Sequence, residues 1–176
     1  MKPSLLLPII VGLVGCDVGP IEPDGGIDGG VALWPEGTLE LGGDDAGAFT
    51  AFPAEVQAIP GAQGGFHVGV MYRVTGQALA GVKFEHRVTR VRDGVLVSKG
   101  TRILDVNPVA AGASWTTEDP ITVFICPTPV GVNVLDEALR FEVKALKNDA
   151  VLSEASATTT LRCPPGNGFC ASICAG

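Results

Sequence analysis

Phe66–Val74 reads FHVGVMYRV, and this stretch decides the fold because apolar side chains occupy every second position along it. Such alternation predicts a β-strand with one face on a core, since successive side chains of a strand point to opposite faces. The other positions hold His67, Gly69, Met71 and Arg73, and Gly76 follows as a turn residue. The face predicted to be buried consists of Phe66, Val68, Val70, Tyr72 and Val74.

The next turn signal along the chain is Asp93-Gly94, which separates two further alternating stretches. An Asp-Gly pair in this setting is a strong hairpin signal, so residues 83–92 are predicted to pair with residues 95–104. Val91 falls out of step with the alternation of the first stretch, which indicates a bulge near Thr89. His86 lies on the apolar face and is predicted to be a partly buried, hydrogen-bonded residue.

No stretch sustains a helical period over three turns, so the rest of the chain is also interpreted as strands and turns. Asn148-Asp149 supplies the turn before the last strand. The fold class predicted from these patterns is all-β, an antiparallel immunoglobulin-like or fibronectin-III-like β-sandwich of about seven to eight strands. Only the architecture is expected, because the buried Trp and paired Cys of antibody domains are not where that family needs them. Further strands are predicted at residues 38–41, 55–59, 121–126, 139–147 and 151–163.

Leu13-Val14-Gly15-Cys16 closes an apolar run that begins at Leu5 behind Lys2. A charge, a short apolar stretch and small residues before a cleavage point are typical of a secretory signal peptide. The run is shorter than the roughly 20 apolar residues of a membrane-spanning helix. These four residues resemble the lipobox of bacterial lipoproteins. The resemblance implies that residues 1–15 are removed and that the Cys16 sulfur carries a diacylglyceryl group; an ordinary cleaved secretory signal is the alternative.

The chain is expected to divide into four parts. After the signal peptide, residues 16–32 form a Gly- and Asp-rich tether without apolar periodicity. Residues 33–163 form the β-sandwich domain, and residues 164–176 form a Cys-containing C-terminal tail. The lipid anchor predicts attachment to a membrane of the cell envelope. We expect the outer membrane, with the domain periplasmic or surface-exposed.

The charge distribution argues against nucleic acid as a partner. The formal net charge is −7, and nine acidic residues but no Lys or Arg lie between Cys16 and Tyr72. Nucleic-acid binding draws most of its affinity from clustered Lys and Arg.

Besides Cys16, four cysteines lie in the second half of the chain. In an exported chain they predict two disulfides, and four cysteines allow three pairings. Cys126 with Cys163 is favoured because each ends a predicted strand, which leaves Cys170 with Cys174. The alternative is a metal site or a thiol-redox pair built from Cys163, Cys170 and Cys174. Against it, a structural zinc site usually has Cys-x2-4-Cys pairs with a fourth ligand, and three residues separate Cys170 from Cys174 where a redox pair has two.

The sequence contains little that catalysis needs. It has two histidines, and it lacks a Gly-x-Ser-x-Gly motif, a phosphate-binding loop with Lys and a pair of carboxylates that can be placed across a cleft. We therefore expect a protein without enzymatic activity, cofactor or bound metal ion.

Four residues are candidates for ligand contact. Gln63 and His67 belong to the glycine-dense stretch IPGAQGGFHV at residues 59–68, and its alternative role is a tight connection whose glycines permit positive φ. Trp34 and Trp115 lie in Gly-, Pro-, Ser- and Thr-rich segments, with ordinary packing as the alternative. The glycine-dense stretch at residues 59–68, the lipobox and the Cys-rich tail resemble a group of uncharacterised Gram-negative lipoproteins with a Gln-Gly-Gly-x-His step. The resemblance covers most of the mature chain and implies no activity.

A basic cluster on neighbouring predicted strands has two interpretations, a solvated polar face or a site for an anionic glycan or lipid headgroup. The function expected from the whole sequence is a lipid-anchored extracytoplasmic binding or structural module of the envelope, with an unknown envelope or surface partner. The alternative is an envelope metal-binding or thiol-redox protein that uses the C-terminal cysteines. The members of the basic cluster are Arg73, Lys83, Arg87, Arg90, Arg92, Lys99 and Arg102.

Overall fold

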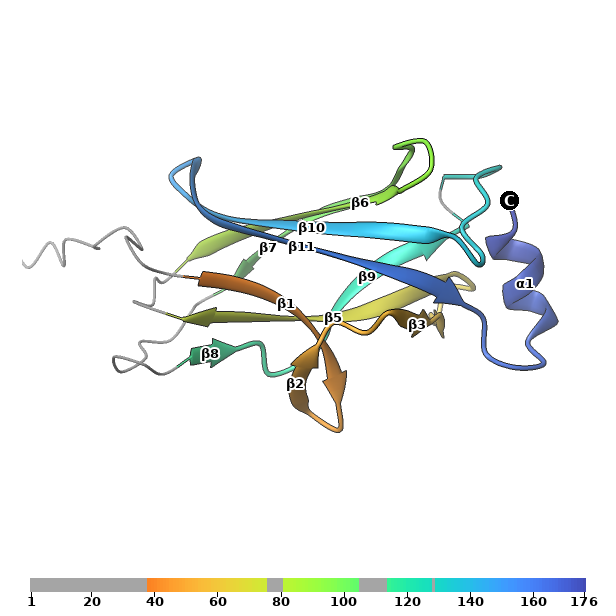
Figure 1. Ribbon diagram of the computed structural model, residues 1–176, viewed down its shortest axis with the longest axis horizontal. Helices are drawn as coiled ribbons and strands as arrows, with labels where there is room; N and C mark the ends of the chain where they lie inside the picture. The colour runs from red at the N-terminus through yellow and green to blue at the C-terminus, as the bar shows by residue number, and fades with distance from the viewer. Residues whose placement is uncertain (1–37, 76–80, 105–113, 128) are drawn as a thin grey trace, which may run out of the picture. The chain divides into compact units, whose positions relative to one another are not determined.

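The computed structural model describes residues 38–75, 81–104, 114–127 and 129–176, and it confirms the prediction of an all-β fold with two sheets (Figure 1). Contacts divide the chain into Met1–Gly30 and Val31–Gly176, and both sheets belong to the second unit. The predicted signal peptide, the predicted lipidation site Cys16, the predicted tether and Trp34 lie outside the described residues. Within the described residues, no helix is long and apolar enough to cross a membrane.

The first sheet is organised around β5 (Phe66–Thr75), with which β1, β4, β8 and β9 all pair antiparallel. A further strand, β2, extends the sheet from β1. The other strands are β1 (Thr38–Asp45), β2 (Ala48–Ala51), β4 (Ile59–Pro60), β8 (Ser114–Thr116) and β9 (Ile121–Cys126).

The second sheet has the strand order β3-β11-β10-β6-β7. Its pairs are antiparallel except for β3, which lies parallel to the end of β11. The strands are β3 (Glu55–Gln57), β6 (Val82–Arg90), β7 (Leu96–Leu104), β10 (Ala138–Lys147) and β11 (Ala150–Arg162).

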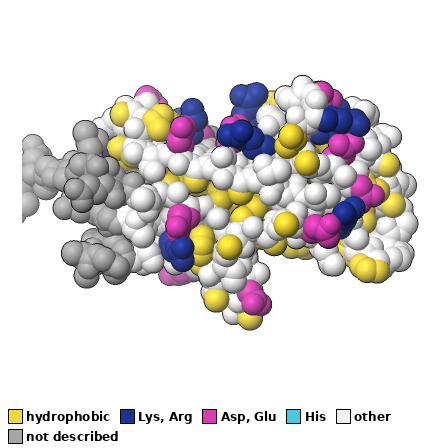
Figure 2. All heavy atoms as spheres, viewed as in Figure 1, with side chains coloured by type: hydrophobic (Ala, Val, Ile, Leu, Met, Phe, Trp, Pro, Cys, Tyr) yellow, Lys and Arg dark blue, Asp and Glu magenta, His cyan; other side chains and the backbone are white. Residues whose placement is uncertain are grey.

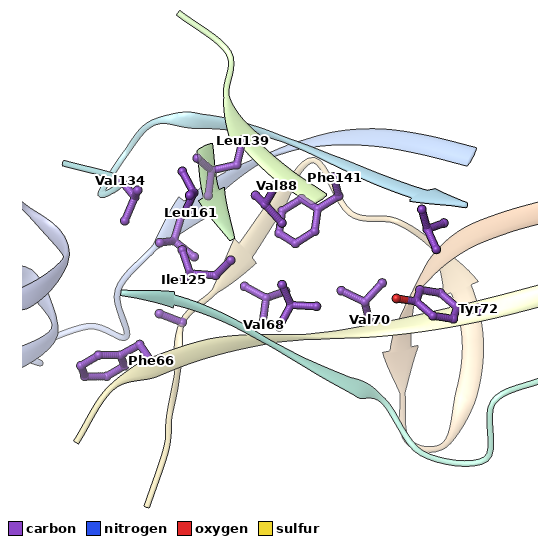
Figure 3. Packing of buried hydrophobic residues seen from close by; sticks show 14 of the residues in the cluster. Phe66, Val68, Val70, Tyr72, Val88, Ile125, Val134, Leu139, Phe141 and Leu161 are labelled. Atoms are coloured by element: carbon purple, nitrogen blue, oxygen red, sulfur yellow. The ribbon is translucent and has the colours of Figure 1, made fainter. Parts of the chain in front are cut away.

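The core lies between the two sheets and follows the alternation seen in the sequence. All five residues predicted to face inward from β5 are at most 2% exposed. They pack against side chains of β6, β10 and β11, among them Val88, Phe141 and Leu161 (Figure 3). Tyr72 stacks on Phe84 of β6 with ring centroids 5.3 Å apart.

The predicted hairpin is confirmed. β6 pairs with β7 from Val82↔Leu104 to Thr89↔Leu96, and the register shifts between Val88 and Thr89, where the bulge was predicted. Gly94 has φ +70°, which glycine adopts without steric cost.

The described residues contain eleven strands, more than the seven or eight expected. One reason is that the predicted strand at residues 55–59 is two short strands in different sheets. β3 pairs with β11, whereas β4 pairs with β5, so the chain crosses between the sheets at Ala58, which is 1% exposed.

The disulfides are Cys126–Cys174 and Cys163–Cys170, so two bonds form as predicted but the favoured pairing was wrong. The expected tail contains a short helix, α1 (Gly168–Cys174), which is capped by the Asn167 side chain accepting from the Cys170 N–H at 2.9 Å. Residues four apart lie on one helix face, and Cys170 and Cys174 both face the core at 0% exposure. Each therefore reaches a different strand end instead of its helix neighbour.

Candidate functional site

A groove on the first sheet contains one of the predicted contact residues, His67. We call it the His67 groove; its volume is about 450 Å³. The end of β1, β3 and β4 border it together with the first half of β5 and the start of β9. The side chains that line it include Asp44, Glu55, Gln57, Ile59, His67, Pro120 and Thr122.

His67 also belongs to a row of outward-facing side chains across three strands. In the register of the sheet, Ile59 of β4 lies opposite His67, and His67 lies opposite Phe124 of β9. The His67 and Phe124 rings meet edge to face with centroids 5.9 Å apart. Ile59 is 46% exposed and Phe124 is 52% exposed, so the row presents apolar surface to solvent on both sides of the imidazole.

The imidazole is held by packing and not by hydrogen bonds at Nδ1. This atom is buried and has no hydrogen-bond partner in the structure. A Cβ at position 61 would lie 3.6 Å from both His67 Nδ1 and Phe124 Cε1, so Gly61 leaves the two rings room to meet. A buried polar atom without a partner is uncommon.

The other predicted contact residues are not part of this groove. Gln63 is exposed in the turn that the Gly61 N–H closes on the Gly65 carbonyl at 2.7 Å, but it does not line the groove. Trp115 lies on β8, half-buried and packed against the core cluster, which favours the packing role.

Phe124 was missed in the sequence although a signal for it exists. In the strand predicted at residues 121–126, Phe124 shares its face with Thr122, a polar residue. A large aromatic residue on the polar face of a strand is the pattern that distinguishes an exposed contact residue from a core residue.

A second groove of about 1090 Å³ lies on the outer face of the second sheet, over β6, β7, β10 and β11. We call it the sheet groove. Figure 2 shows Lys and Arg side chains gathered along the side of the molecule where β6 and β10 lie, with acidic side chains among them.

The structure separates the predicted basic cluster into paired and unpaired cations. Arg73 binds Glu40 on the first sheet, Lys83 binds Glu85 at 2.7 Å, and Arg92 binds Glu137 at 2.8 Å. Arg90 forms a bidentate pair with Asp93. Among the described residues, Arg87, Lys99 and Arg102 are the members of the cluster without an ion pair.

The C-terminal sulfurs form a compact cluster. The Sγ atoms of Cys163, Cys170 and Cys174 lie within 4.8 Å of one another. All of them are bonded in the disulfides, and only a free thiolate ligates a metal or attacks a disulfide. Metal or redox chemistry here would first require reduction.

No protein-family model matches the chain, and no curated protein matches it in sequence. Two of the solved structures that are similar at a distance follow. One is described as a "putative beta-galactosidase from bacteroides fragilis", with 12% identity, a TM-score of 0.38, and coverage of 57% of this chain and 15% of that one. The other is Spo0M, a sporulation control protein from Bacillus subtilis, with 10% identity, a TM-score of 0.38, and coverage of 73% and 50%. The chain spans half or less of either protein, and similarities this distant say nothing about its function.

Proposed function

We propose that this protein is a lipid-anchored binding module of the cell envelope, without enzymatic activity, whose β-sandwich domain contacts its partner at the His67 groove. The anchor rests on the lipobox-like residues 13–16 and the Gly- and Asp-rich segment that follows them. Two or three acyl chains, each burying many methylenes at ~0.8 kcal/mol, hold a protein at a membrane stably.

We further infer an immunoglobulin-like topology. In the first sheet, β1 and β9 flank β5, as strands A and E flank strand B in that fold. The second sheet places β7, β6, β10 and β11 in the order C′-C-F-G, with β3 parallel to the last strand. Domains of this type carry binding on end loops or sheet faces, and the His67 groove lies on such a face.

The observation that carries the binding role is the row of Ile59, His67 and Phe124. Two apolar side chains about half exposed flank an imidazole with an unpartnered buried nitrogen. Covering the apolar side chains would remove their surface from water, a favourable term of about 25 cal/mol per Å² that opposes the entropic cost of association.

Crosslinking in cells tests the binding role. A photoreactive amino acid at position 124 is expected to yield a defined crosslinked product that His67→Ala diminishes. The matched control position is Ile103 of β7, which is 72% exposed but lies on the other sheet. Equal products from both positions would contradict a role for the His67 groove.

Labelling with an alkyne analogue of palmitate tests the anchor: the chain should be labelled, and Cys16→Ser should abolish the label and release the protein from membranes. Protease treatment of intact cells, with a periplasmic protein as leakage control, then distinguishes surface exposure from a periplasmic location.

The cluster of Cys163, Cys170 and Cys174 favours one second candidate, an envelope metal-binding or thiol-redox protein. Alkylation of the native protein without reductant, followed by intact mass measurement, separates the two candidates. Four alkylated thiols would support the second candidate, and none would support structural disulfides.

A further inference from the structure

We propose that the sheet groove binds an anionic polysaccharide, with Arg87 and Lys99 as the residues that hold its carboxylate or phosphate groups. This site lies on the second sheet and is independent of the His67 groove on the first sheet.

The two cations are neighbours because of the hairpin register. Arg87 of β6 lies directly opposite Lys99 of β7. Residues directly opposite in an antiparallel pair have their side chains on the same face, with Cβ atoms about 5 Å apart. Arg87 and Lys99 are both exposed and line the groove, so one anionic group has access to both side chains.

The remaining cations of this face are neutralised, whereas these two are not. Arg140 pairs with Glu142 at 3.2 Å, and Lys144 pairs with Glu154 at 3.8 Å. The third carboxylate that lines the groove, that of Glu85, forms an ion pair with Lys83. Glu142 lies beside Arg87 in the β10 register but is bound to Arg140, so no carboxylate of the groove pairs with Arg87 or Lys99.

Like charges directly opposite each other on a sheet are destabilising. A bound anion would remove this repulsion and add charge-assisted hydrogen bonds, with Arg87 able to bind a carboxylate or phosphate through two parallel N–H groups. On a chain of net charge −7, this unpaired pair is a local attraction for anions.

The shape and lining of the groove favour a hydrated, extended ligand. The groove crosses four strands, which at ~4.8 Å between neighbours is about 14 Å. Hydroxyls of Thr101 and Ser156 line it, and hydroxyls both donate and accept hydrogen bonds. These features suit the hydroxyls and spaced anionic groups of a sugar chain better than an apolar molecule.

Fluorescence anisotropy tests the proposal with the purified, disulfide-bonded protein and labelled oligogalacturonate, a carboxylated sugar chain. We expect saturable binding that weakens with salt, and a loss of about tenfold or more in affinity for Arg87→Gln/Lys99→Gln. The matched control is Arg73→Gln/Arg92→Gln, which removes the same charge outside the groove and should bind as the wild type does.

The proposal would be overturned by no binding of oligogalacturonate, by equal weakening by both double variants, or by equal binding of a neutral dextran of the same length. Binding to vesicles of anionic lipid but not to oligogalacturonate would also overturn it, in favour of a headgroup site. His67→Ala should leave the affinity unchanged, so failure here is distinguishable from failure of the proposed function.

Discussion

Arg90 shows how one residue can look like a candidate ligand contact in the sequence and act as a structural clamp. It is 7% exposed, and its guanidinium binds both carboxylate oxygens of Asp93 and the carbonyl of Asn133. The hydrogen bond from Arg90, aided by the Val95 N–H, holds the pKa of the Asp93 carboxyl below its usual value. The clamp joins the β6–β7 turn to the loop before β10.

The lowered pKa of Asp93 predicts a pH dependence of stability. A carboxyl whose pKa is lower in the folded state stabilises the fold above its unfolded pKa of about 4, and this contribution is lost as the pH falls through the folded value. Asp93→Asn should therefore be less stable than the wild type at pH 7 and should lose less stability between pH 7 and pH 3. Urea unfolding across this range measures both effects. Asp119→Asn, at an exposed position without an ion pair, is the control, and a wild-type pH slope in Asp93→Asn would contradict the prediction.

Gly100 makes room for a half-buried imidazole. A Cβ at this position would lie 2.5 Å from His86 Cε1, closer than real Cβ atoms come to another atom. Gly100→Ala should therefore destabilise the protein by about 1 to 3 kcal/mol through overpacking. Gly168→Ala is the control, because no atom lies within 4 Å of that Cβ position.

In a His86→Ala background the same substitution should cost little, and denaturant unfolding of the double-mutant cycle should give a coupling of about 1 kcal/mol or more. Additive effects would mean that the two residues do not compete for space. The same His86 was predicted to be hydrogen-bonded, whereas its Nδ1 is buried without a partner, and burial together with Arg102 lowers its pKa.

At the scale of elements, α1 depends on its two disulfides. A helix of seven residues is too short to be stable by itself in water. The bonds tie one helix face to the end of β9 and to the residue after β11, which closes one end of the core. The two disulfides therefore stabilise the helix, and its local helix propensity alone would not.

The two disulfides should differ in their contribution to stability. They close segments of 48 and 7 residues, and in the chain-entropy model these closures stabilise by about 4 and about 2 kcal/mol. Cys126→Ala/Cys174→Ala should therefore lose more stability in urea than Cys163→Ala/Cys170→Ala. Equal losses would contradict the model, and peptide mapping without reductant checks the pairing itself.

At the scale of the whole molecule, stability should reside in one unit. The buried hydrophobic residues that the structure describes run from Leu39 to Cys174, and both disulfides fall within this span. A chain that begins at Val31 should therefore unfold in one cooperative transition, within about 0.5 kcal/mol of a chain that begins at Asp17. Thermal and urea unfolding of the two purified chains measure this, and a clearly lower midpoint for the shorter chain would show that residues 17–30 contribute to the fold.

Much of the fold could be predicted because strands have a local signature. The alternation in residues 66–74 predicted the five side chains of β5 that face the core, although Met71 on the other face is buried as well. The Asp-Gly turn predicted that β6 pairs with β7. Asn148 and Asp149 were predicted to turn the chain into the last strand, and both have positive φ, at 49° and 63°. Positive φ at both central residues is what a two-residue hairpin turn of this type requires.

The candidate sites could be predicted only in part, because grooves and ion pairs depend on neighbours that are distant in the sequence. The glycine-dense turn before His67 pointed to this residue in the sequence. Its row also needs Phe124 of β9, which lies beside His67 only because β9 pairs with β5. The basic cluster was visible as a set, but two of its ion pairs join residues that are distant in the sequence, Arg73 with Glu40 and Arg92 with Glu137.

The sequence by itself determined the two-sheet β architecture, the buried face of β5 and the presence of two disulfides, since side-chain alternation and turn chemistry act over a few neighbouring residues. Only the tertiary structure decided which cysteines pair, that α1 exists, and that Arg87 and Lys99 remain without carboxylate partners. The physical reason is that these features are set by distances between strand ends and strand faces, and such distances exist only after the sheets have paired and packed.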